Sequence, residues 1–147
     1  MTAQRLEKEH LAAVAALERE TFKNPWSEQA LALLCGEMAT GVVVMDGARA
    51  AAYGGMMCVA GEGQITNIGT SPDYRRRGLG TAVMAALIAE AQARGLCEIS
   101  LEVRESNVAA IALYEKFGFR MMGKRPRFYT NPTETAFVML LALGGAE

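Results

Sequence analysis

The sequence predicts a mixed α/β fold in which helices cover both faces of a sheet. Segments with helical and strand spacing follow the order strand, helix, helix, three strands, helix, strand, helix, strand, strand. The 147 residues are 51% hydrophobic and 21% charged, the balance of an ordinary globular domain. Because no linker, repeat or low-complexity tract divides them, we expect a single domain over residues 1–147.

Charge and hydropathy exclude several classes of partner. Lys and Arg total 15 against 16 for Asp and Glu, so the net charge is −1. We therefore expect neither nucleic acid nor an anionic membrane as a partner, since both select strongly basic surfaces. The first residues are polar, and the longest apolar run, 82–89, is too short to span a bilayer. These features predict a cytoplasmic protein.

The cysteines and the single histidine argue against metal or hydrolase chemistry. Cys35, Cys58 and Cys97 form no Cys-x-x-Cys pair, so we expect reduced thiols packed as small hydrophobic groups. His10 lies in a charged helical pattern and is expected at the surface. Without a His/Cys cluster, we expect no metal site and no Ser-His-Asp triad.

The N-terminal half predicts a short strand, two helices and three strands. After a strand at 3–6, a helix over 9–22 places Leu11, Val14, Ala15 and Phe22 on one stripe. Residues 24–26 interrupt it, and Ser27 caps a second helix that runs to about residue 38. The strands are expected at 41–45, 49–60 and 64–70, the first two joined by Asp46-Gly47.

The strand at 64–70 has an irregular pattern. In a regular strand, the side chains of Ile65 and Ile68 would lie on opposite faces. A β-bulge near Thr66-Asn67 would place both on one face, and a strand buried on both faces explains the pattern equally well.

The C-terminal half predicts two helices and three strands. A turn at 71–74 leads to a helix over 78–93 with Leu79, Val83, Leu87 and Ala91 on one stripe. Residues 97–104 alternate, with Glu98, Ser100, Glu102 and Arg104 on the polar face. Ser106 caps a short helix that ends near residue 117. The last strands are expected at 119–122 and 136–143, separated by a basic, turn-rich stretch at 124–135.

Residues 75–81, Arg-Arg-Arg-Gly-Leu-Gly-Thr, join a strand to the long helix. Glycines at such a junction let the backbone approach a ligand, and the first N–H groups of a helix are free to bind an anion. The spacing fits neither a nucleotide-triphosphate nor a dinucleotide motif. From these residues alone, two interpretations stay open: a loop that binds a pyrophosphate group, and a solvated basic turn.

At these residues the chain resembles the GNAT superfamily of acyl-CoA N-acyltransferases, whose pyrophosphate motif Gln/Arg-x-x-Gly-x-Gly/Ala matches 75–80. It further resembles the RimI-like subfamily, which acetylates the N-terminal alanine of a small-subunit ribosomal protein. That likeness rests on four stretches: 24–27 (Asn-Pro-Trp-Ser), 67–74 (Asn-Ile leading to Pro-Asp-Tyr), 101–107 (Leu-Glu-Val-Arg-Glu-Ser-Asn) and 110–119 (Ala-Ile-Ala-Leu-Tyr-Glu through Gly-Phe). The resemblance implies a mostly antiparallel sheet with a splayed central strand pair.

The resemblance also assigns roles to individual residues. It implies that Glu102 is the general base for the attacking amine and that Tyr114 is the general acid for the departing thiolate. It implies contacts with acetyl-CoA, as acyl donor without a metal, at Ile68, Gly69, Thr70, Arg75, Arg76, Arg77, Gly78, Leu79, Gly80, Thr81 and Asn107. Taken alone, Glu102 is an ordinary solvated glutamate, Tyr114 a core tyrosine, and Asn107 a residue of the helix start.

The acceptor implied by the resemblance is the α-amine of a protein, attacked directly in a ternary complex, with a ribosomal protein as partner. Trp26, Phe128 and Tyr129 are then expected to bind it. The chain departs from the subfamily at 128–132, Phe-Tyr-Thr-Asn-Pro, which replaces a Tyr-Tyr-Pro step, and in the shorter loop that follows, where Glu134 is the only acid. Other amines (an amino acid, a polyamine, an aminoglycoside or a lysine) remain open as acceptors. A non-catalytic acyl-CoA-binding module is a further alternative, although such a module needs neither Glu102 nor Tyr114.

Overall fold

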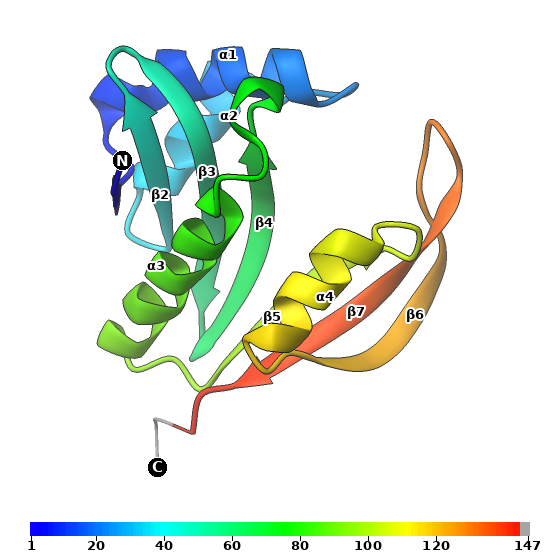
Figure 1. Cartoon of the computed structure of the whole chain (residues 1–147). Helices are drawn as coiled ribbons and strands as arrows, with labels where there is room; N and C mark the ends of the chain where they lie inside the picture. Colours follow the sequence, from blue (N-terminus) through cyan, green and yellow to red (C-terminus); the bar gives the residue numbers. More distant parts are fainter. Residues whose placement is uncertain (145–147) are drawn as a thin grey trace.

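The computed structural model describes residues 1–144 and contains a seven-stranded sheet with the order β1-β2-β3-β4-β5-β7-β6 (Figure 1). The strands are β1 (Ala3–Arg5), β2 (Ala39–Asp46), β3 (Arg49–Val59), β4 (Glu62–Thr70), β5 (Glu98–Arg104), β6 (Arg120–Tyr129) and β7 (Glu134–Ala142). The α-helices are α1 (Leu11–Thr21), α2 (Glu28–Leu31), α3 (Leu79–Ala93) and α4 (Val108–Lys116), and short 3-10 turns lie at η1 (Lys8–His10), η2 (Ala32–Cys35) and η3 (Pro72–Tyr74). Every neighbouring pair of strands is antiparallel except β4 and β5, as the mostly antiparallel prediction requires.

Helices cover both faces of the sheet, as predicted. The core against α3 and α4 contains Val83, Leu87 and Tyr114, and the core against α1 and α2 contains Val14 and Leu31. All four residues of the α3 stripe are buried, which confirms the period of that helix. Burial of these two apolar surfaces holds the helices on the sheet.

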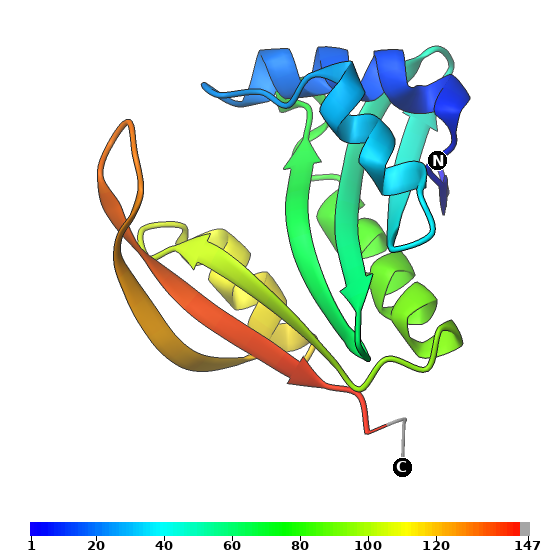
Figure 2. The same ribbon diagram turned by 180° about the vertical axis from the view of Figure 1, so that it is seen from behind.

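The centre of the sheet is split. Strands β4 and β5 are parallel and pair only from Glu62–Gln64 to Glu98–Ser100, and then diverge (Figure 2). In β4 the pairing with β3 steps from Gly55↔Asn67 to Met56↔Ile65, so Thr66 is an extra residue. Of the two explanations that the sequence left open, the structure thus shows the bulge, and Ile65 and Ile68 both pack against the core on the α3 face.

Two predicted elements have different lengths in the structure. The second helix is α-helical only over α2, tightens into η2 and ends at Gly36, well before residue 38. The expected loop at 124–135 is mostly strand, because β6 continues to Tyr129 and β7 begins at Glu134. Strand β6 is an exposed edge strand without an alternating apolar face, and Pro126 lies where its register shifts, so strand spacing was not visible in the sequence.

Four local predictions are wrong. His10 is buried at 7% exposure, because its Nδ1 accepts a hydrogen bond from the Glu7 N–H at 2.9 Å. Phe22 is 38% exposed, since α1 ends one residue before it. Helix α4 is capped by Asn107 rather than Ser106, through a 3.2 Å hydrogen bond from the Ala110 N–H to Asn107 Oδ1. The cysteines are free thiols as expected, but Cys97 is exposed rather than packed.

Between residues 1 and 144, no helix has the length and apolar character needed to cross a membrane.

Candidate functional site

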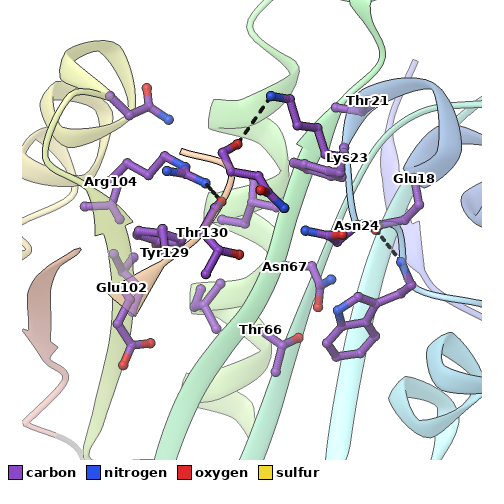
Figure 3. Close-up of a pocket in the computed structure, with 18 of the residues that line it drawn as sticks. Glu18, Thr21, Lys23, Asn24, Thr66, Asn67, Glu102, Arg104, Tyr129 and Thr130 are labelled. Carbon is purple, nitrogen blue, oxygen red and sulfur yellow. Dashed lines mark hydrogen bonds between the residues drawn. The ribbon is translucent and has the colours of Figure 1, made fainter. Parts of the chain in front are cut away.

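A cleft of about 670 Å³ opens where β4 and β5 part (Figure 3). One wall comes from β5, α4 and the β6–β7 turn, and the other comes from β4, the end of α1 and the segment that follows it. Six of the residues expected to act in catalysis or binding line it together: Trp26, Ile68, Glu102, Asn107, Tyr114 and Tyr129. These residues are far apart in sequence, so the splayed strands bring them to one place.

Glu102 projects from the polar face of β5 into the cleft (Figure 3). Its neighbours Leu101 and Val103 are buried on the opposite face, as the alternation predicts. The carboxylate is 14% exposed, and its Oε2 lies 3.7 Å from Nη1 of Arg125 on β6. It is therefore a shielded carboxylate that still reaches the cleft, as a general base requires.

Tyr114 reaches the cleft from α4 and is 8% exposed. Its ring packs 5.9 Å from that of Phe119. Burial raises the pKa of the Tyr114 phenol to about 12, and the nearby Tyr129 adds to the rise. The hydroxyl therefore keeps its proton at neutral pH, which is the state that a general acid needs.

Tyr129 lies at the end of β6, beside the cleft. Both Tyr129 and Glu102 line the cleft; burial raises the pKa of the Tyr129 phenol, and the Glu102 carboxylate raises it further. The guanidinium of Arg104 covers the Tyr129 ring at 4.4 Å from the centroid. Phe128 does not line the cleft; it is 44% exposed and packs edge-on against Tyr129 at 5.0 Å.

The opposite wall contains a buried carboxylate. Glu18 of α1 is 1% exposed and accepts hydrogen bonds from the Trp26 N–H at 2.9 Å and from the Tyr53 phenol. Burial, followed by the Glu18 carboxylate, raises the pKa of Tyr53. Glu18 thus ties the segment that carries Trp26 to the sheet, and Figure 3 shows it on the wall opposite Glu102.

The loop that carries the expected pyrophosphate motif leads into α3. Gly78 is the N-cap residue and has φ of +74°, a left-handed conformation that favours glycine. The first intrahelical bond of α3 runs from the Ala82 N–H to the Gly78 carbonyl, so the preceding N–H groups are left for a ligand. Arg75, Arg76 and Arg77 are exposed around them, whereas Leu79 is buried in the core.

Beyond Gln64, β4 has no pairing with β5, so its edge is open along Ile68, Gly69 and Thr70. Ile68 lines the cleft, while Gly69 is buried against α1, where an added Cβ would lie 3.0 Å from the Phe22 ring. Asn107 lines the cleft from the start of α4, where it also serves as the cap. The open edge and the α3 loop together suit an extended ligand that carries amide and pyrophosphate groups.

Several cleft residues were not anticipated as site residues. Glu18 falls on the apolar stripe of α1, four residues after Val14, and a charge at such a position is a usable signal. Arg104 shares the polar face of β5 with Glu102. In the part of the chain that the structure describes, three buried side-chain oxygens lack a hydrogen-bond partner: Thr21 Oγ1, Thr66 Oγ1 and Asn67 Oδ1. All three residues line the cleft, so its α1-facing wall is polar.

No group of His, Cys, Asp and Glu within residues 1–144 is placed to hold a metal ion.

Known proteins match this chain in sequence and in structure. A profile of the acetyltransferase (GNAT) family matches residues 11–119. The [ribosomal protein bS18]-alanine N-acetyltransferase of Escherichia coli strain K12 is 38% identical over 97% of both chains, and a putative enzyme of the same name from Bacillus subtilis strain 168 is 32% identical over 92% of this chain and 91% of its own. The crystal structure of the Escherichia coli ribosomal-protein-S18-alanine N-acetyltransferase matches with a TM-score of 0.90 and 37% identity, covering 99% of this chain and 96% of that one.

Proposed function

Because the chain belongs to the acetyltransferase (GNAT) family, we propose that it moves the acetyl group of acetyl-CoA to the N-terminal α-amine of a protein. The acceptor that we propose is the N-terminal alanine of ribosomal protein bS18, the substrate named for its relatives. The site of action is then the cytoplasm. The observation that carries this proposal is the meeting of Glu102 and Tyr114 in the cleft between the splayed strands.

The two residues supply the proton transfers of direct acyl transfer. Glu102 accepts a proton from the amine, directly or through a water, as the nitrogen bonds to the acetyl carbon. Tyr114 gives its phenolic proton to the sulfur as the carbon–sulfur bond breaks, so the products are an amide and a thiol. The proton on Glu102 then returns to solvent, and Tyr114 is reprotonated. No residue of the chain needs to carry the acyl group.

The residues around the α3 loop fit acetyl-CoA as the donor. The free N–H groups ahead of Ala82 and the positive end of α3 suit its pyrophosphate, and Arg76 and Arg77 add positive charge. The open edge of β4 at Ile68–Thr70 suits the amide groups of its arm. Acetyl-CoA supplies the activated acyl group, and the chain holds and orients it.

The cleft favours an α-amine over a lysine side chain. The reference pKa of an α-amine is about 8, roughly two units below that of lysine, so Glu102 obtains the neutral nucleophile at a lower free-energy cost. Trp26 and Tyr129 stand on opposite walls and bound a space for the first residue of a peptide. A small first residue such as alanine lets the backbone approach Glu102 closely.

A panel of peptides that differ only in their first residue tests the proposal. We expect the largest kcat/KM for the Ala-starting peptide and no transfer when its α-amine is blocked. Free polyamines, aminoglycosides and N-blocked lysine peptides serve as competing acceptors. Faster transfer to any of these would reject the peptide assignment and leave the family chemistry in place.

A further inference from the structure

We propose that Arg104 is a positioning residue that fixes the acceptor wall of the cleft. The inference rests on the proposed function, because it concerns how that site holds the peptide. In this proposal Arg104 transfers no proton and makes no contact with acetyl-CoA.

Arg104 holds the whole β6–β7 turn with one side chain. Its Nη1 donates to the Pro132 carbonyl at 3.0 Å, and its Nη2 donates to the Thr130 carbonyl at 3.0 Å. The guanidinium plane also covers the Tyr129 ring at 4.4 Å. A planar fork can make these contacts simultaneously, whereas a lysine ammonium cannot. The turn and Tyr129 therefore share one anchor.

Glu134 connects this anchor to Ser106, just before the start of α4. One carboxylate oxygen lies 3.2 Å from Arg104 Nη1, and the other accepts the Ser106 N–H at 2.7 Å. The Ser106 hydrogen bonds, and then Arg104, lower the pKa of Glu134, so it stays ionised at neutral pH. Each oxygen thus has a partner within the chain, so we assign the single acid of this loop to holding the turn rather than to recognising a basic peptide.

A second contact ties the turn to the opposite wall. Lys23, just after α1, donates from Nζ to the Asn131 carbonyl at 3.3 Å (Figure 3). Lys23 is exposed, so this contact alone is weak, and besides the backbone pairing of Tyr129 with Glu134 the turn is held by the two hydrogen bonds from Arg104. The turn therefore lies across the acceptor end of the cleft, with Thr130, Asn131 and Pro132 lining it.

Arg104 also determines where Tyr129 stands relative to the base. Arg104 and Glu102 are two residues apart on the same face of β5, and Tyr129 packs on Arg104 near the Glu102 carboxylate. Loss of the guanidinium releases Tyr129 and the turn but leaves Glu102 and Tyr114 in place. The expected result is weaker acceptor binding with little change in the chemical step.

Kinetics and fluorescence of Arg104→Gln test this inference. We expect the KM of an Ala-starting peptide to rise about 10-fold or more, with kcat within about 3-fold of wild type and the KM of acetyl-CoA within about 2-fold. Trp26 is the only tryptophan of the chain and lines the cleft, so its fluorescence reports binding of the same peptide in the presence of CoA. The dissociation constant measured in this way should rise in parallel with KM.

Matched variants separate positioning from a general loss of structure. Arg104→Lys should recover part of the affinity, since it keeps the charge but not the fork. Glu134→Gln should weaken peptide binding less, and the double variant should be no worse than Arg104→Gln alone. Arg120→Gln, at the exposed far end of β6, should behave as wild type. If Arg104→Gln does not fold, the Glu134→Gln and Arg104→Lys variants decide the question.

Unchanged peptide affinity in the folded variants, or a fall in kcat with unchanged peptide KM, overturns the inference while the proposed function stands. A wild-type enzyme that acetylates other amines but no peptide overturns both.

Discussion

The proposed donor site and the proposed acceptor site are built by different means. The proposed donor site is formed mainly by backbone: the open edge of β4, where Ile68 lines the cleft, and, beyond the residues that line the cleft, the left-handed Gly78 and the N–H groups that begin α3. The proposed acceptor site is shaped by contacts between side chains, chiefly those of Arg104, Glu134 and Tyr129.

This difference has consequences for specificity. A backbone site recognises a constant ligand and is disturbed mainly by added Cβ atoms, whereas a side-chain site changes with single substitutions. A family that keeps its acyl donor and varies its acceptor can therefore change one end of the cleft without changing the other. Glu102 and Tyr114 both line the cleft, and in the proposed mechanism Glu102 acts on the acceptor amine and Tyr114 on the donor sulfur.

The largest effect on turnover is expected for a substitution of Glu102. Glu102→Gln keeps the side-chain size and removes the base, so kcat should fall by about 10²- to 10⁴-fold, with the affinity for acetyl-CoA nearly unchanged. Steady-state kinetics with calorimetry measure both quantities. Glu98→Gln, on the same face of β5 but outside the cleft, is the matched control. Near-normal turnover of Glu102→Gln would place the base elsewhere.

Tyr114→Phe should lower kcat by about 10²-fold, because only the proton donor is removed and the ring still packs against Phe119. Burial raises the pKa of this phenol to about 12, so the proton is present below that pH and is lost only above it. The wild-type rate should therefore rise as the amine is deprotonated and show no decline due to Tyr114 below about pH 11. A decline near pH 10 that disappears in Tyr114→Phe would mean that burial does not protect the phenol.

A smaller effect, confined to the donor end, is expected at Gly80. Gly80→Val crowds the start of α3 and should weaken acetyl-CoA binding about 10-fold by calorimetry, while peptide binding changes little. Gly80→Ala is the control for the fold, since a Cβ there would meet Leu113 Cδ2 at an ordinary 3.4 Å. If folded Gly80→Val binds acetyl-CoA as the wild type does, the pyrophosphate does not lie at this loop.

The two ends also differ in how far the sequence predicts them. The donor loop at 75–81 is contiguous, and its strand–turn–helix context and glycines are local signals. The alternation of β5 predicts that Glu102 lies on the polar face. The phase change in β4 is explained by a bulge or by a strand buried on both faces, and the structure shows the bulge.

The acceptor end depends on contacts between residues that are far apart in the sequence, and local sequence patterns do not predict such contacts. Arg104 and Glu134 are 30 residues apart, and the turn between β6 and β7 was expected inside a longer loop. Glu18 reaches its partner Tyr53 across 35 residues. Edge strand β6 has no buried face to give an alternating pattern, so its start was predicted but its extension to Tyr129 was missed.

The most direct test is to find where the acetyl group is placed on an acceptor that offers both kinds of amine. The acceptor is ribosomal protein bS18 that begins with alanine and carries its internal lysines. It is incubated with acetyl-CoA and the enzyme, and the acetylated residues are then located by tandem mass spectrometry. The proposed function predicts a single acetyl group on the N-terminal residue, formed with wild type and greatly slowed with Glu102→Gln. Acetylation of internal lysines with a free N-terminus would contradict it.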